Sequence, residues 1–152
     1  MRDSNTNIQS KGFEYFRKIR TELTLAQRKH ILRQLIIGLP TKLNASARKV
    51  LDIVFENKDV LDEEDFLRLI DYLIGHISTA VTPEARLLAL EYTLRLDNLY
   101  RRATEVLQAV LDVYGTGEPK VQEIGKQILS KFRRYKVKNG FWEEVERVVG
   151  KI

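Results

Sequence analysis

The sequence predicts an all-α protein of about eight helices in antiparallel pairs that form a short α-α superhelix. Apolar residues recur at three- and four-residue spacing, and no stretch alternates apolar and polar residues as a strand does. Three segments, which begin at Ala47, Ala85 and Val121, share one apolar pattern at spacings of 38 and 36 residues. Helical repeats of this length bury the apolar face of each unit against its neighbours. Short connections favour antiparallel neighbours, so the pattern predicts a stack of helix pairs.

The first two helices follow a polar start of the chain. Residues 12–23 place three apolar side chains at three-residue spacing and predict the first helix. Thr24 and Gln27 have the spacing of a capping box, which predicts the start of the second helix. That helix is expected to stop near Gly38, because Pro40 cannot extend it. Its expected inward residues are Leu25, Ile31, Leu32, Leu35, Ile36 and Leu39.

The next three helices have clear start signals. The third helix is expected over residues 44–56, and Asp62 is expected to cap the fourth. Three acidic residues directly after Asp62 meet the positive end of the helix dipole. They could suggest a metal site, but consecutive residues fan around a helix, so we interpret them as a charged helix start. Thr82 and Pro83 combine a capping hydroxyl with proline at the first helical position and predict the fifth helix.

Three more helices complete the chain. Asp97 or Asn98 is expected to start the sixth helix, and Pro119 opens the seventh. The glycine-containing segment 115–117 between them is a loop and not a phosphate cradle, because it lacks the lysine and the preceding strand of a nucleotide loop. Gly140 precedes a last short helix, where Phe141 and Trp142 look suited to closing the stack.

The bulk properties are those of a folded globular protein. Of the 152 residues, 43% are hydrophobic and 31% are charged, which excludes wholesale disorder. Residues 1–10 are expected to be a flexible leader, and residues 11–152 a single α-helical repeat-like domain. No apolar run approaches the roughly 18 residues that span a bilayer, and the start lacks a signal-peptide core. We therefore expect a cytoplasmic protein with no membrane partner.

The repeated segments resemble the HEAT-like α-solenoid repeat family over roughly residues 43–150. The matching residues follow Pro83 and Pro119 and are Ala85-Arg86 with Leu88-Ala89, and Val121-Gln122 with Ile124-Gly125. The arginine that first helices of this family often carry is present at Arg48 and Arg86 but is replaced by Gln122 in the third unit. A compact bundle that does not repeat stays open as an alternative.

The resemblance implies a protein-binding or assembly module, since the second helices of such stacks usually line the partner-binding face. Tyr72 beside Arg68 is the kind of aromatic and arginine pair that interfaces favour. The alternative is that Tyr72 lies over Arg68 and serves only packing. The candidate partner-binding residues are Arg33, Arg68, Tyr72, Arg101, Glu105 and Gln108.

Charge suggests nucleic-acid binding as a second function. Residues 1–38 and 116–152 carry net charges of +5 and +4, whereas residues 39–115 carry −4. Phe132 falls within the apolar arc of the seventh helix and is expected in the core. The alternative is a solvated helix end whose basic residues complement the dipole. The candidate nucleic-acid-binding residues are Lys126, Lys131, Arg133, Arg134, Lys136 and Lys138.

Catalytic chemistry has little support in the sequence. There is no cysteine, and neither His30 nor His76 has a second ligand at metal-binding spacing. No serine occupies a nucleophile turn. We expect no cofactor, no metal and no enzyme activity, while a carboxylate-based site between helices stays open as a third possibility.

Overall fold

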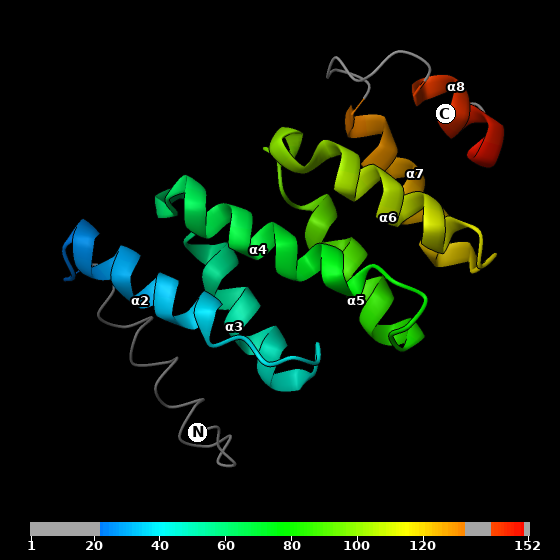
Figure 1. The fold of residues 1–152 in the computed structure, drawn as a ribbon. Coiled ribbons are helices and arrows are strands. Elements are labelled where there is room, and N and C mark those ends of the chain that lie inside the picture. The colour runs from blue at the N-terminus through cyan, green and yellow to red at the C-terminus, as the bar shows by residue number, and fades with distance from the viewer. Residues whose placement is uncertain (1–21, 133–140, 151–152) are drawn as a thin grey trace. The chain divides into compact units, whose positions relative to one another are not determined.

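The described part of the chain consists of helices joined by irregular connections. The computed structural model describes residues 22–132 and 141–150, which contain seven α-helices and no strand. The all-α prediction is therefore confirmed (Figure 1). None of these helices is long and apolar enough to cross a membrane. The α-helices are α2 (Leu25–Ile37), α3 (Ala45–Glu56), α4 (Glu63–His76), α5 (Pro83–Leu94), α6 (Ala103–Tyr114), α7 (Pro119–Lys131) and α8 (Phe141–Val149).

The count of seven differs from the eight helices expected. The expected leader, residues 1–10, and nearly all of the expected first helix lie outside the described residues. The described remainder of that helix, Glu22 and Leu23, is a turn and a bend. Two short 3-10 helices, η1 (Lys58–Val60) and η2 (Tyr100–Arg102), accompany the α-helices.

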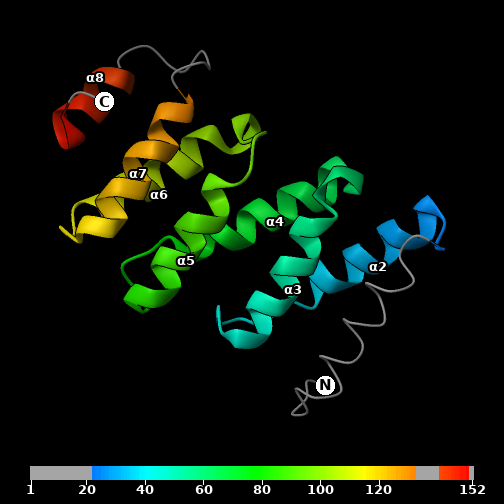
Figure 2. The same cartoon turned by 180° about the vertical axis from the view of Figure 1, so that it is seen from behind.

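The chain divides into two compact units, Met1–Leu69 and Ile70–Ile152. The first unit contains α2, α3, η1 and the first half of α4, and the second unit contains the second half of α4, η2 and α5 to α8 (the α-helices are labelled in Figure 2). Each unit has its own buried apolar residues.

In the first unit, α2 packs against α3 and η1. Thr24 and Gln27 form the expected capping box: Gln27 donates its backbone N–H to Thr24 Oγ1 at 3.1 Å, and Thr24 donates its own N–H to Gln27 Oε1 at 2.9 Å. Gly38 ends the helix, as expected. Leu25 was expected to face inward, but it is 51% exposed, and Ala26 and Gln27 directly after it are exposed too.

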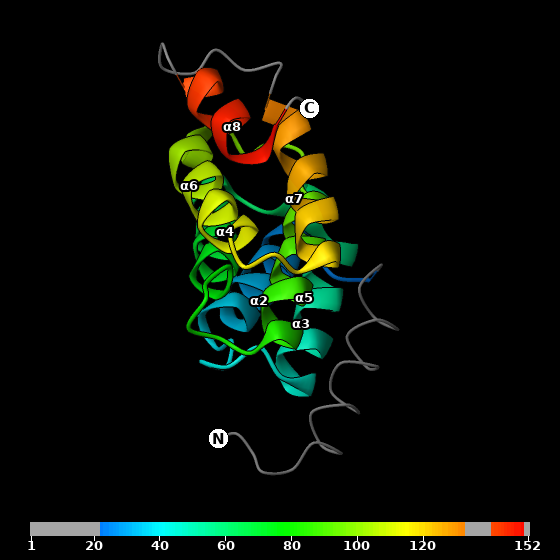
Figure 3. The same cartoon turned by 90° about the vertical axis from the view of Figure 1, so that its right-hand side faces the viewer.

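In the second unit, α7 packs against both α5 and α6, and α8 packs against α6 (Figure 3). The expected core residues Ala89, Val110 and Phe132 are all fully buried. Gly125 marks the closest approach in this core: a Cβ atom there would lie 3.2 Å from Val110 Cγ1 and 3.6 Å from a ring carbon of Tyr114. The absence of a side chain at Gly125 therefore permits the close packing of α7 on α6.

The predicted helix starts are confirmed where the capping side chain bonds to an N–H in the first turn of its own helix. Asn44 Oδ1 accepts from the N–H of Ala47 at 2.9 Å, and Thr82 Oγ1 accepts from the N–H of Ala85 at 3.2 Å. These bonds satisfy donors that the first helical turn leaves unpaired. Pro119 likewise stands in the first turn of α7.

The start of the sixth helix was placed wrongly. It was expected at Asp97 or Asn98, but α6 begins at Ala103 after the 3-10 helix η2. Leu99 is 1% exposed, and its carbonyl accepts from Arg102 N–H at 3.0 Å in a three-residue turn. Burial of Leu99 therefore keeps this segment in a tighter turn before the α-helix can begin.

Candidate partner-binding site

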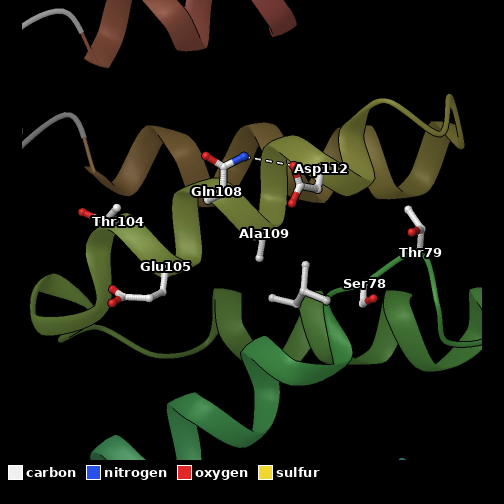
Figure 4. A pocket seen from close by; sticks show the side chains of 8 residues that line it. Ser78, Thr79, Thr104, Glu105, Gln108, Ala109 and Asp112 are labelled. Carbon is white, nitrogen blue, oxygen red and sulfur yellow. Dashed lines mark hydrogen bonds between the residues drawn. The ribbon is translucent and has the colours of Figure 1, made fainter.

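A groove of about 470 Å³ lies along one face of α6 in the second unit (Figure 4). We call it the α6 groove. One side is formed by α6 and the other by residues 77–79, at the start of the connection that follows α4. Its lining residues are Ile77, Ser78, Thr79, Thr104, Glu105, Gln108, Ala109 and Asp112.

The connection on the far side of the groove is held by Arg86, a residue of α5 that is only 6% exposed. Its guanidinium donates to the carbonyl oxygens of Ser78 at 2.9 Å, Thr79 at 3.3 Å and Val81 at 3.1 Å. It also forms an ion pair with the carboxylate of Glu118, directly before α7. A planar guanidinium suits this task because it presents several donors in one fixed fork. Arg86 therefore positions the Ser78 and Thr79 side of the groove.

The α6 side is tied to α4 by an ion pair between Arg102 and Asp71. Arg102 donates from Nε to Asp71 Oδ1 at 2.8 Å and from Nη2 to Oδ2 at 3.3 Å. The hydrogen bond to Asp71 raises the pKa of Arg102 above its usual value. The two-point contact orients the segment that leads into α6 relative to the last turns of α4.

The groove combines an apolar floor with polar groups along its rim. Ile77 and Ala109 are 3% and 9% exposed. Glu105, Gln108 and Asp112 are exposed, and Gln108 donates from its side-chain amide to Asp112 Oδ1 at 3.0 Å. Because these three residues are spaced three and four apart, they share one face of α6. The expected partner-binding residues Glu105 and Gln108 therefore lie together.

Two other expected partner-binding residues of the second unit, Tyr72 and Arg101, lie against the rings of nearby side chains. Tyr72 is half-buried rather than exposed, and its ring centroid lies 4.7 Å from that of His76, one turn later on α4. Burial raises the pKa of the Tyr72 phenol to about 12. The guanidinium of Arg101 lies 5.9 Å from the ring centroid of Tyr100, which is 55% exposed.

The remaining two, Arg33 and Arg68, belong to an ion-pair network in the first unit. Arg33 donates from Nε to both carboxylate oxygens of Asp65 at 3.1 Å and from Nη2 to Asp62 at 2.9 Å. Arg68 contacts Asp65 at 3.1 Å and Glu64 at 2.7 Å. Asp65 is 1% exposed, so two arginines neutralise one buried carboxylate.

This network explains the acidic residues at the start of α4. Lys29 adds a contact to Asp62 at 2.9 Å, and the pKa of Asp62 is lowered chiefly by its hydrogen bond from Lys29. The acidic cluster therefore holds α2 against the first turn of α4, in addition to facing the helix dipole. Among the described residues, no group of three His, Asp or Glu side chains could hold a metal ion.

The expected nucleic-acid-binding residues are only partly described. Lys126 is exposed on α7. Lys131 donates to the carbonyl oxygens of Leu94 and Leu96 and lies 3.8 Å from Asp97, so it caps the end of α5. Phe132 is fully buried, as expected. Arg133, Arg134, Lys136 and Lys138 lie outside the described residues.

A second hollow, of about 530 Å³, lies at the first turns of α5 and α7. Its lining includes the apolar residues Pro83, Leu87, Pro119 and Val121. The carboxylate of Glu118 at its edge is already bound to Arg86. The α6 groove offers more polar groups to orient a ligand and is therefore the stronger candidate.

Two residues of the α6 groove lining, Glu105 and Gln108, were among the partner-binding residues expected from the sequence. The face of Glu105 and Gln108 followed from helical spacing, and the same spacing extends to Thr104 and Asp112. Ser78 and Thr79 had no comparable signal, because their place depends on Arg86, which lies seven or more residues further along the chain.

Comparisons with known proteins give no relative. No family model matches the chain. No curated protein and no solved structure shows a significant match either.

Proposed function

We propose that this chain is a non-catalytic module of HEAT-like antiparallel helix pairs that binds another protein through the α6 groove. The pairing is supported by two corresponding helix starts, since α5 and α7 both begin with proline. Ala89 and Gly125, 36 residues apart, are both small and buried. A cytoplasmic location remains our expectation.

The observation that carries the proposal is the open form of the α6 groove. Five of its eight lining residues are exposed, and they surround an apolar floor. Small-molecule sites bury about 70–90% of the ligand surface, which an open groove along a helix does not do. A segment of another protein can instead lie along the helix face and bury one side of itself.

Charge at the groove favours a protein over a nucleic acid. Glu105 and Asp112 are both exposed at its rim, and their carboxylates would repel phosphates. The basic end of α7 supports the alternative of nucleic-acid binding less directly, because Lys131 already donates to backbone carbonyls of the second unit.

Affinity capture from extracts of the source cell tests this function with one blocking variant. Ala109→Leu adds three carbon atoms to the floor of the groove and should exclude a partner whatever its charge. We expect the wild-type chain to retain a specific protein after nuclease treatment, and Ala109→Leu to lose it.

The matched control is Leu111→Ile, a buried apolar exchange on α6 outside the groove lining, which should retain the partner. Unfolding measurements on both variants confirm that they are folded. Retention of the same partner by folded Ala109→Leu would refute binding through the α6 groove. Complete loss of the captured material with nuclease would favour nucleic-acid binding instead.

A further inference from the structure

The charges of the α6 groove are arranged along a line. Glu105 and Asp112 are seven residues apart, which is two helical turns, so they lie on one side of α6 about 10 Å apart along its axis. Gln108 lies between them and hydrogen-bonds to Asp112. Two negative charges therefore stand at the two ends of a polar strip.

Neither carboxylate forms an ion pair within the part of the chain that the structure describes. Asp112 accepts only the side-chain N–H of Gln108. Glu105 is near enough to Arg102 to raise its pKa, but the guanidinium of Arg102 is directed to Asp71 at 2.8 Å. The two carboxylates are thus available to cations from another molecule.

The groove also offers hydrogen-bonding groups that suit a peptide backbone. Thr79 and Thr104 present hydroxyl groups, and Gln108 has a side-chain carbonyl oxygen beside the amide that it donates. A helical partner would already use its backbone N–H and C=O groups internally. An extended segment keeps them available, and its side chains can rest on Ile77 and Ala109.

We propose that the α6 groove takes an extended basic segment of a partner protein, with two arginine or lysine side chains three residues apart that pair with Glu105 and Asp112. In a polyproline II conformation, side chains three residues apart point the same way and lie about 9 Å apart, which is close to the spacing of about 10 Å between Glu105 and Asp112 along the axis of α6. Their methylene stems lie over the apolar floor, as long basic side chains do on apolar surface. This assignment rests on the proposed function and names the chemistry of the partner.

Fluorescence anisotropy with short labelled peptides tests the assignment on the full chain. The probe contains Arg-x-x-Arg in a proline- and serine-rich background, and matched probes replace both arginines with glutamine or place them adjacent. At about 50 mM salt we expect the Arg-x-x-Arg probe to bind most tightly, and at about 300 mM salt its affinity should fall.

The charge variant Glu105→Gln with Asp112→Asn keeps the shape of the groove and removes both charges. Because each exposed ion pair is worth up to about 1 kcal/mol, we expect the affinity for the Arg-x-x-Arg probe to fall roughly 5- to 30-fold. The matched control, Glu91→Gln with Glu123→Gln, removes two exposed carboxylates from α5 and α7 and should leave the affinity unchanged.

Three results overturn the assignment. The first is absence of binding by every probe. The second is binding that does not depend on charge, seen either as equal affinity for the arginine and glutamine probes or as unchanged affinity in the charge variant. The third is a change in the oligomeric state of the chain in the charge variant, which would make a second copy the occupant. If Ala109→Leu loses the natural partner while the charge variant retains it, the proposed function stands and only the basic chemistry fails.

Discussion

Arg86 holds the side of the α6 groove that lies opposite α6, through hydrogen bonds to the backbone of Ser78 and Thr79. Arg86→Met keeps much of the apolar stem but removes the donors that bind Ser78, Thr79 and Val81, and also the partner of Glu118. Removing one member of a buried ion pair costs about 3–5 kcal/mol, and a hydrogen bond to a charged group is worth about 1.5–3 kcal/mol.

These costs do not simply add, because most of the groups that lose their hydrogen bond to Arg86 can bond to water instead. Glu118 is 33% exposed, Thr79 is exposed, and Ser78 and Val81 are half-buried. We therefore expect Arg86→Met to lower the free energy of unfolding by about 2–4 kcal/mol. The same variant should weaken partner binding, because Ser78 and Thr79 lose their support.

Urea unfolding followed by tryptophan fluorescence and by far-ultraviolet circular dichroism, which reports the helices of both units and therefore also covers the control, measures this effect. Trp142 is the single tryptophan of the chain and lies on α8 in the second unit, the unit that contains Arg86. The control is Arg48→Met, which changes an exposed arginine at the corresponding position of the proposed first repeat and should alter stability by less than about 0.5 kcal/mol. Equal effects of the two substitutions would refute the structural role of Arg86.

Three further predictions concern the second unit. Gly125→Leu should destabilise the second unit by about 1–3 kcal/mol, because the new side chain meets Val110, whereas Gly75→Ala should stabilise α4 by about 0.5–1 kcal/mol, since no other described element lies within 4 Å of a Cβ atom there. Urea unfolding that ranks the two variants in the opposite order would contradict the packing. Thr82→Ala should cost about 0.5–2 kcal/mol and more than Pro83→Ala, because only Thr82 accepts a helix N–H; thermal melts giving the reverse order would disprove the cap. The free energy of unfolding should fall as the pH rises from 10 towards 12, since Tyr72 ionises near 10.0 when unfolded and at about 12 when folded; an unchanged alkaline pH profile for Tyr72→Phe would contradict this.

Local signals in the sequence were sufficient for most helix boundaries. Thr24, Asn44 and Thr82 each accept a hydrogen bond from a residue three positions later, so the relevant chemistry lies within one helical turn. The inward faces also followed from spacing, because burial in a helix repeats every three or four residues.

Features that depend on residues far apart in the chain could not be predicted from local sequence patterns. The start of α6 was misplaced because buried Leu99 holds a 3-10 turn before it. Lys131 was grouped with phosphate-binding candidates, yet it reaches back more than thirty residues to the end of α5.

The candidate site likewise has one side that local spacing predicts and one side that depends on distant residues. Glu105 and Gln108 followed from the spacing of α6, whereas the opposite side needed the contacts of Arg86. Tyr72 was expected to be exposed, but it is half-buried and its ring lies close to that of His76. A sequence pattern gives the direction of a side chain from its helix, but not the side chains that other elements bring against it.

Site-specific photo-crosslinking tests the central claim most directly, because it reports what contacts the α6 groove in the cell. A photo-reactive residue replaces Gln108 in the groove or, as the control, exposed Glu91 on α5. Protein binding at the groove predicts a discrete protein adduct from position 108 that resists nuclease and is absent from position 91. No protein adduct from position 108, or one identical to that from position 91, would contradict it.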